Sequence, residues 1–291
     1  MKFHRALAIP VLVATAALTL TACGGNDDAS SGNVVRIGTT DRDHTWEVFE
    51  QKAKAKGITL KTTNFSDYKQ PNLALAQKQI DVNLFQHLQF LGQYNVANND
   101  TLTPIGATYI VPLGLYSKKH KSVAEIPQGG EIAIPNDPTN QARALNVLQS
   151  AGLLKLTGAP RQPTPADIDK AASKVKVTPV DAAQTALSLN SVDGSVINNT
   201  FLERSGVDPK SAIYKDDPKD PAAEPYINTL VTRAADKNNP LYLQLVDIWH
   251  DPDVQQAEAE TTKGTAVEVK RGGPELEQIL TRVQQNLRDQ K

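Results

Sequence analysis

Apolar and polar residues are grouped along the chain in blocks that predict strands and helices in alternation. Short apolar or alternating runs typical of β-strands occupy residues 34–38, 58–62, 80–84, 130–135, 175–179 and 194–198. Apolar residues at helical spacing occupy residues 46–53, 72–79, 86–94, 138–151, 182–189, 240–250, 252–262 and 275–289. This alternation predicts an α/β protein with mostly parallel sheets and helices on their faces.

Two extended segments interrupt the alternation and predict how the chain divides into domains. Residues 107–117, which include Pro112 and Gly114, and residues 226–232 are more typical of crossovers between domains than of central strands. We therefore expect two lobes, with lobe I built from residues 33–116 and 225–291 and lobe II from residues 117–224. In such folds ligands lie in the cleft, near strand ends and helix N-termini.

The first residues predict export and a lipid anchor. Lys2, His4 and Arg5 precede an apolar segment at residues 6–20 that is too short to span a bilayer, so residues 1–22 are interpreted as a signal peptide. Small residues before Cys23 resemble the lipobox of bacterial lipoproteins. This resemblance implies that Cys23 becomes the lipid-bearing N-terminus at the extracytoplasmic face of the cell membrane. An ordinary signal peptide whose cleavage site happens to precede a cysteine is the alternative.

The segment after the lipobox and the charge balance narrow the possible partners. Residues 23–32 are polar and rich in glycine and serine, which predicts a flexible tether. Without residues 1–22 the net charge is 29 − 32 = −3, against 31 − 32 = −1 for the whole chain, so we expect no nucleic-acid partner. No later run of about twenty apolar residues predicts a membrane span.

Metal, cofactor and catalytic signatures are missing from the sequence. Cys23 is the only cysteine and has no disulfide partner, and the histidines after residue 22 do not follow metal-ligand spacing. No nucleotide-binding loop or nucleophile motif follows a predicted strand. The acidic residues 216–220 (DDPKD) lack a calcium-loop pattern and are interpreted as a solvated turn. We therefore expect a binding protein without metal or cofactor rather than an enzyme.

A strand-to-helix junction at residues 134–143 (IPNDPTNQAR) carries the first candidate binding group. Asn136 or Asp137 is expected to cap the helix and Pro138 to occupy its first turn, so that free backbone N–H groups face outward. A helix N-terminus beside an arginine such as Arg143 suits a carboxylate or a phosphate. From the residues alone, a simple cap followed by a solvated arginine remains the alternative.

A second segment, residues 66–87 (SDYKQPNLALAQKQIDVNLFQH), carries a family resemblance. It resembles the NlpA family of methionine ABC-transporter substrate-binding lipoproteins, as do residues 134–143, 195–198 and 224–228. The resemblance extends from about residue 33 to about residue 264, with the blocks in the family's order. It implies a type II periplasmic-binding-protein fold that closes on a free amino acid and delivers it to an ABC permease and its ATPase. The implied ligand is methionine, in L or D form, or a closely related amino acid or short methionine peptide.

The resemblance also implies which residues bind the ligand. An aromatic box for a thioether side chain would consist of Tyr68, Phe85, His87 and Phe90. Arg143 would hold the α-carboxylate by a bidentate pair, assisted by the helix mouth, while Asn198 and Asn228 would hydrogen-bond the amine and carboxylate. Without the resemblance, ordinary core packing is the alternative for Tyr68, Phe85 and Phe90, and a structural histidine is the alternative for His87. Tyr109 is a weaker candidate for the site, and hinge packing is the interpretation that we prefer for it.

Two stretches depart from the family pattern. Residues 39–44 (TTDRDH) replace a glycine-containing loop, which either changes what the pocket accepts or simply caps the next helix. After residue 264 an added amphipathic helix is expected to pack against a lobe or a partner. Its apolar face consists of Leu276, Ile279, Leu280, Val283 and Leu287.

Three other functions remain open at this stage. One is binding of a small carboxylate other than methionine. Another is a dehydratase-like enzyme on the same fold, with His44 or His87 as the acid or base. The third is an adhesive lipoprotein that retains the fold without transport.

Overall fold

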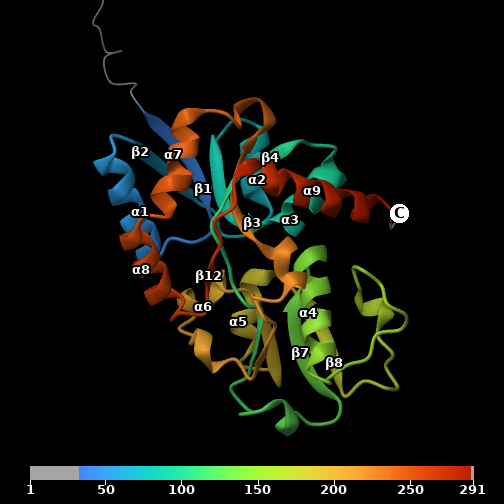
Figure 1. Cartoon of the computed structure of the whole chain (residues 1–291). Helices are drawn as coiled ribbons and strands as arrows, with labels where there is room; N and C mark the ends of the chain where they lie inside the picture. Colours follow the sequence, from blue (N-terminus) through green and yellow to red (C-terminus); the bar gives the residue numbers. More distant parts are fainter. Residues whose placement is uncertain (1–32, 290–291) are drawn as a thin grey trace, which may run out of the picture. The chain divides into compact units, whose positions relative to one another are not determined.

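Two five-stranded sheets organise the chain in the computed structural model, which describes residues 33–289 (Figure 1). The first sheet has the order β2-β1-β3-β11-β4, with β1 at Val34–Thr39, β2 at Thr59–Asn64, β3 at Val82–His87, β4 at Leu102–Ala107 and β11 at Asn228–Arg233. The second sheet has the order β10-β6-β9-β7-β8, with β6 at Gly114–Tyr116, β7 at Gly130–Pro135, β8 at Val175–Val180, β9 at Gly194–Ile197 and β10 at Tyr214–Lys215. A small third pair joins β5 at Tyr109–Ile110 to β12 at Val267–Glu268.

Helices cover both large sheets. Those around the first sheet are α1 at His44–Ala55, α2 at Gln70–Ala76, α3 at Leu88–Asn98, α7 at Pro240–Trp249, α8 at Pro252–Thr261 and α9 at Gly273–Arg288. Those around the second sheet are α4 at Pro138–Ser150, α5 at Thr185–Ser188 and α6 at Thr200–Arg204. Short 3₁₀ turns lie at Val123–Glu125, Pro165–Asp167, Ala182–Gln184, Pro209–Ser211, Pro221–Tyr226 and Ala234–Asp236. We call the elements around the first sheet lobe I and those around the second sheet lobe II.

The α/β prediction is confirmed, and the helix and strand boundaries agree with the sequence patterns to within a few residues. Three helices begin at an Asp-Pro or Asn-Pro pair, because the first residue caps and proline suits the first turn. The capping side chains of Asp137, Asn239 and Asp251 each accept a backbone N–H of the helix that follows. These local signals explain why α4, α7 and α8 begin where the sequence predicts.

The sheets are mixed rather than mostly parallel, and this corrects the interpretation of residues 226–232. β11 is a central strand of the first sheet and runs antiparallel to both β3 and β4. Its neighbouring side chains point to opposite faces, so Leu230 and Val231 enter different core clusters. β4 was not predicted, since Pro104 and Gly106 hide its pattern; as an edge strand it tolerates a proline.

The position of β6 bears on where the lobes divide. β6 at Gly114–Tyr116 pairs with β9 and β10, so it belongs to the second sheet although it precedes residue 117. From Asn33 on the chain forms one compact unit, and the lobe boundaries stay a prediction. The expected signal peptide, tether and Cys23 lie outside the described residues.

The C-terminal helix packs against lobe I, which decides between the two roles expected for it. Its five apolar residues, Leu276, Ile279, Leu280, Val283 and Leu287, are buried in the core cluster that includes β11 and α3. Gly92 of α3 allows this close approach: a Cβ placed there would lie 2.5 Å from Cγ1 of Val283.

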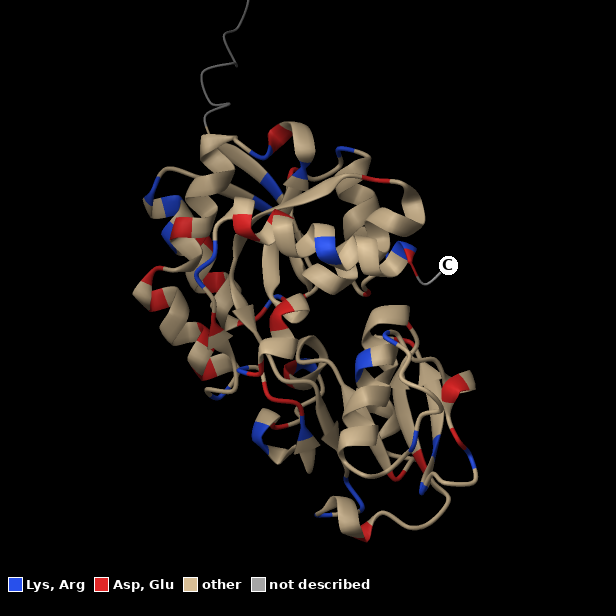
Figure 2. Ribbon diagram, turned by 45° about the vertical axis from the view of Figure 1, so that its right-hand side comes forward, with Lys and Arg blue, Asp and Glu red and all other residues tan. Residues whose placement is uncertain are grey.

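Charged residues of both signs are interspersed over both lobes (Figure 2), consistent with the small net charge of −1. None of the helices between residues 33 and 289 is long and apolar enough to cross a membrane.

Candidate functional site

Side chains from both lobes meet around a small cavity of about 40 Å³. All seven residues expected to bind a ligand line it: Tyr68, Phe85, His87, Phe90, Arg143, Asn198 and Asn228. The remaining lining residues are Gln86, Tyr109, Val111, Asn140, Asn199 and Thr200. The structure thus brings together the predicted residues, and their roles toward a ligand stay predictions.

The aromatic residues form a cluster on one wall of the cavity. Tyr68 lies 6.0 Å from Phe85 and 5.9 Å from Phe90 between ring centroids, and Phe85 lies 5.8 Å from Phe90. Phe85 and His87 share one face of β3 because alternate residues of a strand point the same way. Phe201 of α6 adds a ring from lobe II, 5.2 Å from Tyr68. No sequence pattern indicated Phe201, because its contact joins segments far apart in the chain.

His87 is a neutral hydrogen-bonding residue at the junction of β3 and α3. Its Nδ1 accepts the backbone N–H of Phe90 at 3.0 Å, so the ring proton lies on Nε2, which donates to Oδ1 of Asn140 at 3.3 Å. Burial, and then the nearby charge of Arg143, lower the pKa of His87 to about 3. A histidine that stays neutral and has both nitrogens engaged is poorly suited to general acid–base chemistry near neutral pH.

Asn140 links the two lobes and was missed as a site residue. Its Oδ1 accepts from His87 of lobe I and, at 2.9 Å, from Nδ2 of Asn198 of lobe II. Its Nδ2 donates to both carboxylate oxygens of Asp137, at 3.0 and 3.1 Å. Asn140 lies in the first turn of α4, three residues before Arg143, and this position in the sequence could have indicated it as a site residue. Oδ1 of Asn198 is buried and finds no donor in the described part of the chain, so it is free for a ligand N–H.

The start of α4 confirms the predicted cap, and this cap occupies part of the expected anion seat. The Asp137 side chain accepts the backbone N–H of Asn140 at 2.9 Å, and Pro138 is the first helical residue. The carboxylate of Asp137 therefore already occupies the helix mouth, and burial raises its pKa. The Asn140 N–H is therefore already taken, and assistance to a ligand carboxylate from the other N–H groups of the first turn stays a prediction.

Arg143 is buried and held by protein groups along one edge of its guanidinium. Nε donates to Oδ2 of Asp216 at 2.6 Å, and Nη2 donates to Oδ1 of the same carboxylate at 3.1 Å and to the carbonyl of Val111 at 3.0 Å. The interpretation of Asp216 as part of a solvated turn is therefore wrong. The Nε–Nη2 edge is already paired, so a ligand carboxylate must meet Arg143 through Nη1, which has no acceptor among the described residues.

Asn228, at the start of β11, and Tyr109, in β5, also line the cavity. Asn228 begins β11 directly opposite His87 in the antiparallel ladder and is buried. Tyr109 lines this cavity and a second one, so it does more than pack the hinge.

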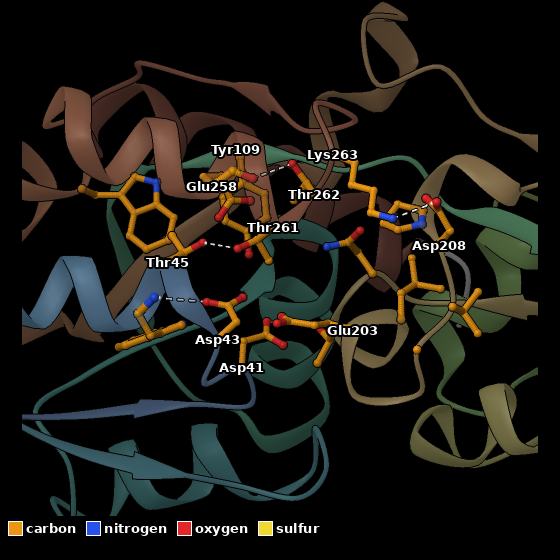
Figure 3. Close-up of a pocket in the computed structure, with 18 residues that line it drawn as sticks. Asp41, Asp43, Thr45, Tyr109, Glu203, Asp208, Glu258, Thr261, Thr262 and Lys263 are labelled. Carbon is orange, nitrogen blue, oxygen red and sulfur yellow. Dashed lines mark hydrogen bonds and ion pairs between the residues drawn. The ribbon is translucent and has the colours of Figure 1, made fainter.

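The second cavity adjoins the first and is acidic (Figure 3). It measures about 240 Å³, and Tyr109, Asn199 and Thr200 line both cavities. Five carboxyl side chains line it: Asp41, Asp43, Glu203, Asp208 and Glu258. Burial, and then neighbouring carboxylates, raise the pKa of Asp41 to about 7 and that of Glu258 to about 8.

The unusual loop at residues 39–44 builds part of this acidic cavity. Asp43 caps α1 by accepting the backbone N–H of Trp46 at 3.1 Å, which confirms the cap interpretation. Asp41 accepts the hydroxyl of Thr200 at 3.2 Å across the lobes. The loop residues do not line the ligand cavity itself. Within residues 33–289 no group of three or more His, Cys, Asp or Glu residues is placed to hold a metal ion.

Two α/β lobes around a cavity lined by aromatic, amide and arginine side chains define a two-lobed substrate-binding protein. A family model described as NlpA lipoprotein matches residues 35–270. The chain belongs to the NlpA lipoprotein family, which confirms the resemblance seen in the sequence.

Relatives and solved structures agree with this assignment. The D-methionine-binding lipoprotein MetQ of Escherichia coli (strain K12) is 33% identical over 273 residues, covering 91% of this chain and 98% of that protein. The substrate binding protein of a methionine transporter from Streptococcus pneumoniae is 37% identical with a TM-score of 0.76, covering 81% of this chain and 95% of the other. A nutrient binding protein from Burkholderia cenocepacia bound to methionine is 35% identical with a TM-score of 0.75, covering 80% and 99%.

Proposed function

We propose that this chain is the lipid-anchored, extracytoplasmic substrate-binding protein of an ABC importer and that it binds methionine, in L or D form, or a closely related amino acid or short methionine peptide. The observation that carries the proposal is the lining of the interlobe cavity. The buried cation Arg143, the buried amide oxygen of Asn198, which has no donor among residues 33–289, and the aromatic cluster match the carboxylate, the ammonium and the apolar side chain of such a ligand.

The charge of the cavity suits a zwitterion. Arg143 is the only ionised side chain among the described lining residues, since His87 is neutral. Asp216, which does not line the cavity, forms an ion pair with Arg143. A ligand with one carboxylate and one ammonium adds no net charge to this balance. A dicarboxylate would bring a second negative charge for which the lining offers no cation.

The aromatic cluster suits a thioether side chain. Burying a side chain of methionine size contributes roughly 1.5–3 kcal/mol, and sulfur–ring contacts add about 0.3–1.5 kcal/mol. Desolvation by Tyr68, Phe85 and Phe90 thus supplies more of the affinity than the sulfur contacts do.

Contacts from both lobes explain how binding favours closure. His87 of lobe I and Asn140 of lobe II are joined directly at 3.3 Å, and a ligand in the cavity that both residues line adds contacts to each lobe. Only the closed arrangement completes this set, so the ligand stabilises it by its differential affinity.

The anchor and the transport partners follow from the family. Relatives are named as lipoproteins or as the binding protein of a methionine transporter. By analogy this chain is anchored through a lipid on Cys23 and hands its ligand to a membrane permease driven by an ATPase. A dehydratase-like activity is disfavoured, because His87 is neutral and a similar solved structure is the substrate binding protein of a methionine transporter.

The test uses protein lacking the lipid and freed of ligand by unfolding and refolding. L-Methionine at about 100 times Kd is expected to stabilise the fold by about 2.7 kcal/mol, seen as a rise in Tm. Arg143→Ala is expected to abolish this rise, while Arg42→Ala, whose side chain is 48% exposed, keeps it. If neither methionine enantiomer nor a methionine dipeptide raises Tm, methionine is the wrong ligand.

A further inference from the structure

Arg143 is immobilised by a carboxylate that sequence reasoning had assigned to solvent. Asp216 uses both of its oxygens on Arg143, at 2.6 and 3.1 Å, and the Arg143 side chain is only 5% exposed. The two residues lie 73 positions apart in the chain. Their pairing joins α4 to the end of β10 behind the ligand cavity.

Asp216 is itself fixed by the segment that connects the lobes. Its Oδ1 accepts the backbone N–H of Leu113 at 2.8 Å, and its own N–H donates to the carbonyl of Leu113 at 3.3 Å. The preceding residue, Lys215, pairs with Gly114 in the antiparallel β10–β6 ladder. The carboxylate therefore has a defined position before any ligand arrives.

The remaining contacts of Arg143 leave one direction open. The ring of Tyr226 covers the guanidinium at 4.1 Å from Cζ, and the carbonyl of Val111 accepts from Nη2 at 3.0 Å. Nη1 alone keeps both hydrogens without an acceptor in the described structure. A buried arginine with one free nitrogen can offer a ligand carboxylate a fixed point of contact rather than a mobile charge.

We propose that Asp216 is the positioning residue of the ligand site: it orients Arg143 so that Nη1 faces the ligand carboxylate, and it thereby sets the preference for a free carboxylate. This inference rests on the proposed function, since it assumes a carboxylate ligand in that cavity. Asp216 touches no ligand atom in this scheme and acts through Arg143. Preorganisation of this kind lowers the ordering cost that binding must otherwise meet.

Two ligands separate a positioning role from a merely structural one. L-Methionine has the carboxylate, and L-methioninamide keeps the amine and side chain but lacks it. Binding is measured by calorimetry at pH 6, on folded protein, for wild type, Asp216→Ala, Asp216→Asn and the control Asp217→Asn. Asp217 is the adjacent carboxylate and is exposed.

In Asp216→Ala we expect methionine to bind at least about tenfold more weakly, in line with the loss of charge-assisted hydrogen bonds, while methioninamide changes less than about threefold. Asp216→Asn keeps the shape of the side chain and one acceptor oxygen, so we expect its affinity for methionine to lie between those of wild type and Asp216→Ala. Asp217→Asn should match wild type. Equal weakening of both ligands, or methionine binding within about twofold of wild type in Asp216→Ala, overturns the positioning role.

A ligand-independent readout separates this inference from the proposed function. In NMR spectra of the ligand-free wild type, the Nε–H signal of Arg143 should be protected from solvent exchange, and Asp216→Ala should abolish that protection. If wild type does not bind methionine, the proposed function fails. A protected Nε–H signal in the wild type would still support the positioning of Arg143 by Asp216. An unprotected Arg143 signal in wild type overturns the inference itself.

Discussion

Glu258 supplies a pH-dependent stability that a single isosteric substitution should remove. It lies on α8, is 8% exposed and lines the acidic cavity. Burial first, and then the charges of Asp43 and Asp41, raise the pKa of Glu258 from its ordinary 4.5 to about 8. The folded state therefore binds this proton more tightly than the unfolded state. Its contribution to stability is fully present below pH 4.5 and is lost as the pH rises toward 8.

The size of this change in stability follows from the difference between the pH of the experiment and 4.5, the ordinary pKa of a glutamate side chain. At pH 7 the gap is 7 − 4.5 = 2.5 pH units, and at about 1.36 kcal/mol per unit this is at most about 3.4 kcal/mol. At pH 5 the same arithmetic leaves about 0.7 kcal/mol. Asp41, whose pKa is itself raised to about 7, and Glu203, whose pKa is also raised, repel Glu258 less when they bind protons, so we expect a gain of roughly 1–3 kcal/mol for Glu258→Gln at pH 7.

Urea unfolding at pH 5, 6 and 7 measures this directly. Glu258→Gln should be more stable than wild type at pH 7, with the gain shrinking steadily toward pH 5. Glu260→Gln, on the same helix but exposed, serves as the control and should show no such slope. A gain in stability that is the same at every pH, or a variant that is less stable than wild type at pH 7, would refute the conclusion that Glu258 is a buried carboxyl with a raised pKa.

Two further substitutions test packing and capping. Gly92→Ala would place a Cβ 2.5 Å from Cγ1 of Val283, so we expect a loss of about 1–3 kcal/mol in urea unfolding, with part of the loss recovered in the double variant Gly92→Ala, Val283→Ala. An unchanged free energy of unfolding would show that α9 shifts freely on α3. Asp137→Ala removes the cap of α4 and both contacts to the Asn140 amide, so we expect a loss of about 1–2 kcal/mol in stability and weaker methionine binding by calorimetry. Stability loss with unchanged affinity would separate the cap from the ligand site.

Much of the local structure and of the candidate site was accessible to sequence reasoning. Apolar periodicity located β7 and α4 almost to the residue, and the Asp-Pro pair indicated the cap at Asp137. The family blocks indicated Tyr68 and His87, which line the cavity as expected. The placement of β11 was not accessible, because a single apolar run fits a crossover as well as a central antiparallel strand until its neighbours are known.

The sequence by itself determined the α/β alternation, the helix starts and the family, since each depends on residues close together in the chain or on blocks in a fixed order. Only the tertiary structure decided the partners of those residues. It paired Arg143 with Asp216, joined Asn140 to His87, brought Phe201 to Tyr68 and gathered the five carboxyls around the second cavity. Each of these contacts joins segments far apart in the chain, and their geometry depends on how the two lobes meet. Local propensity carries no information about that arrangement.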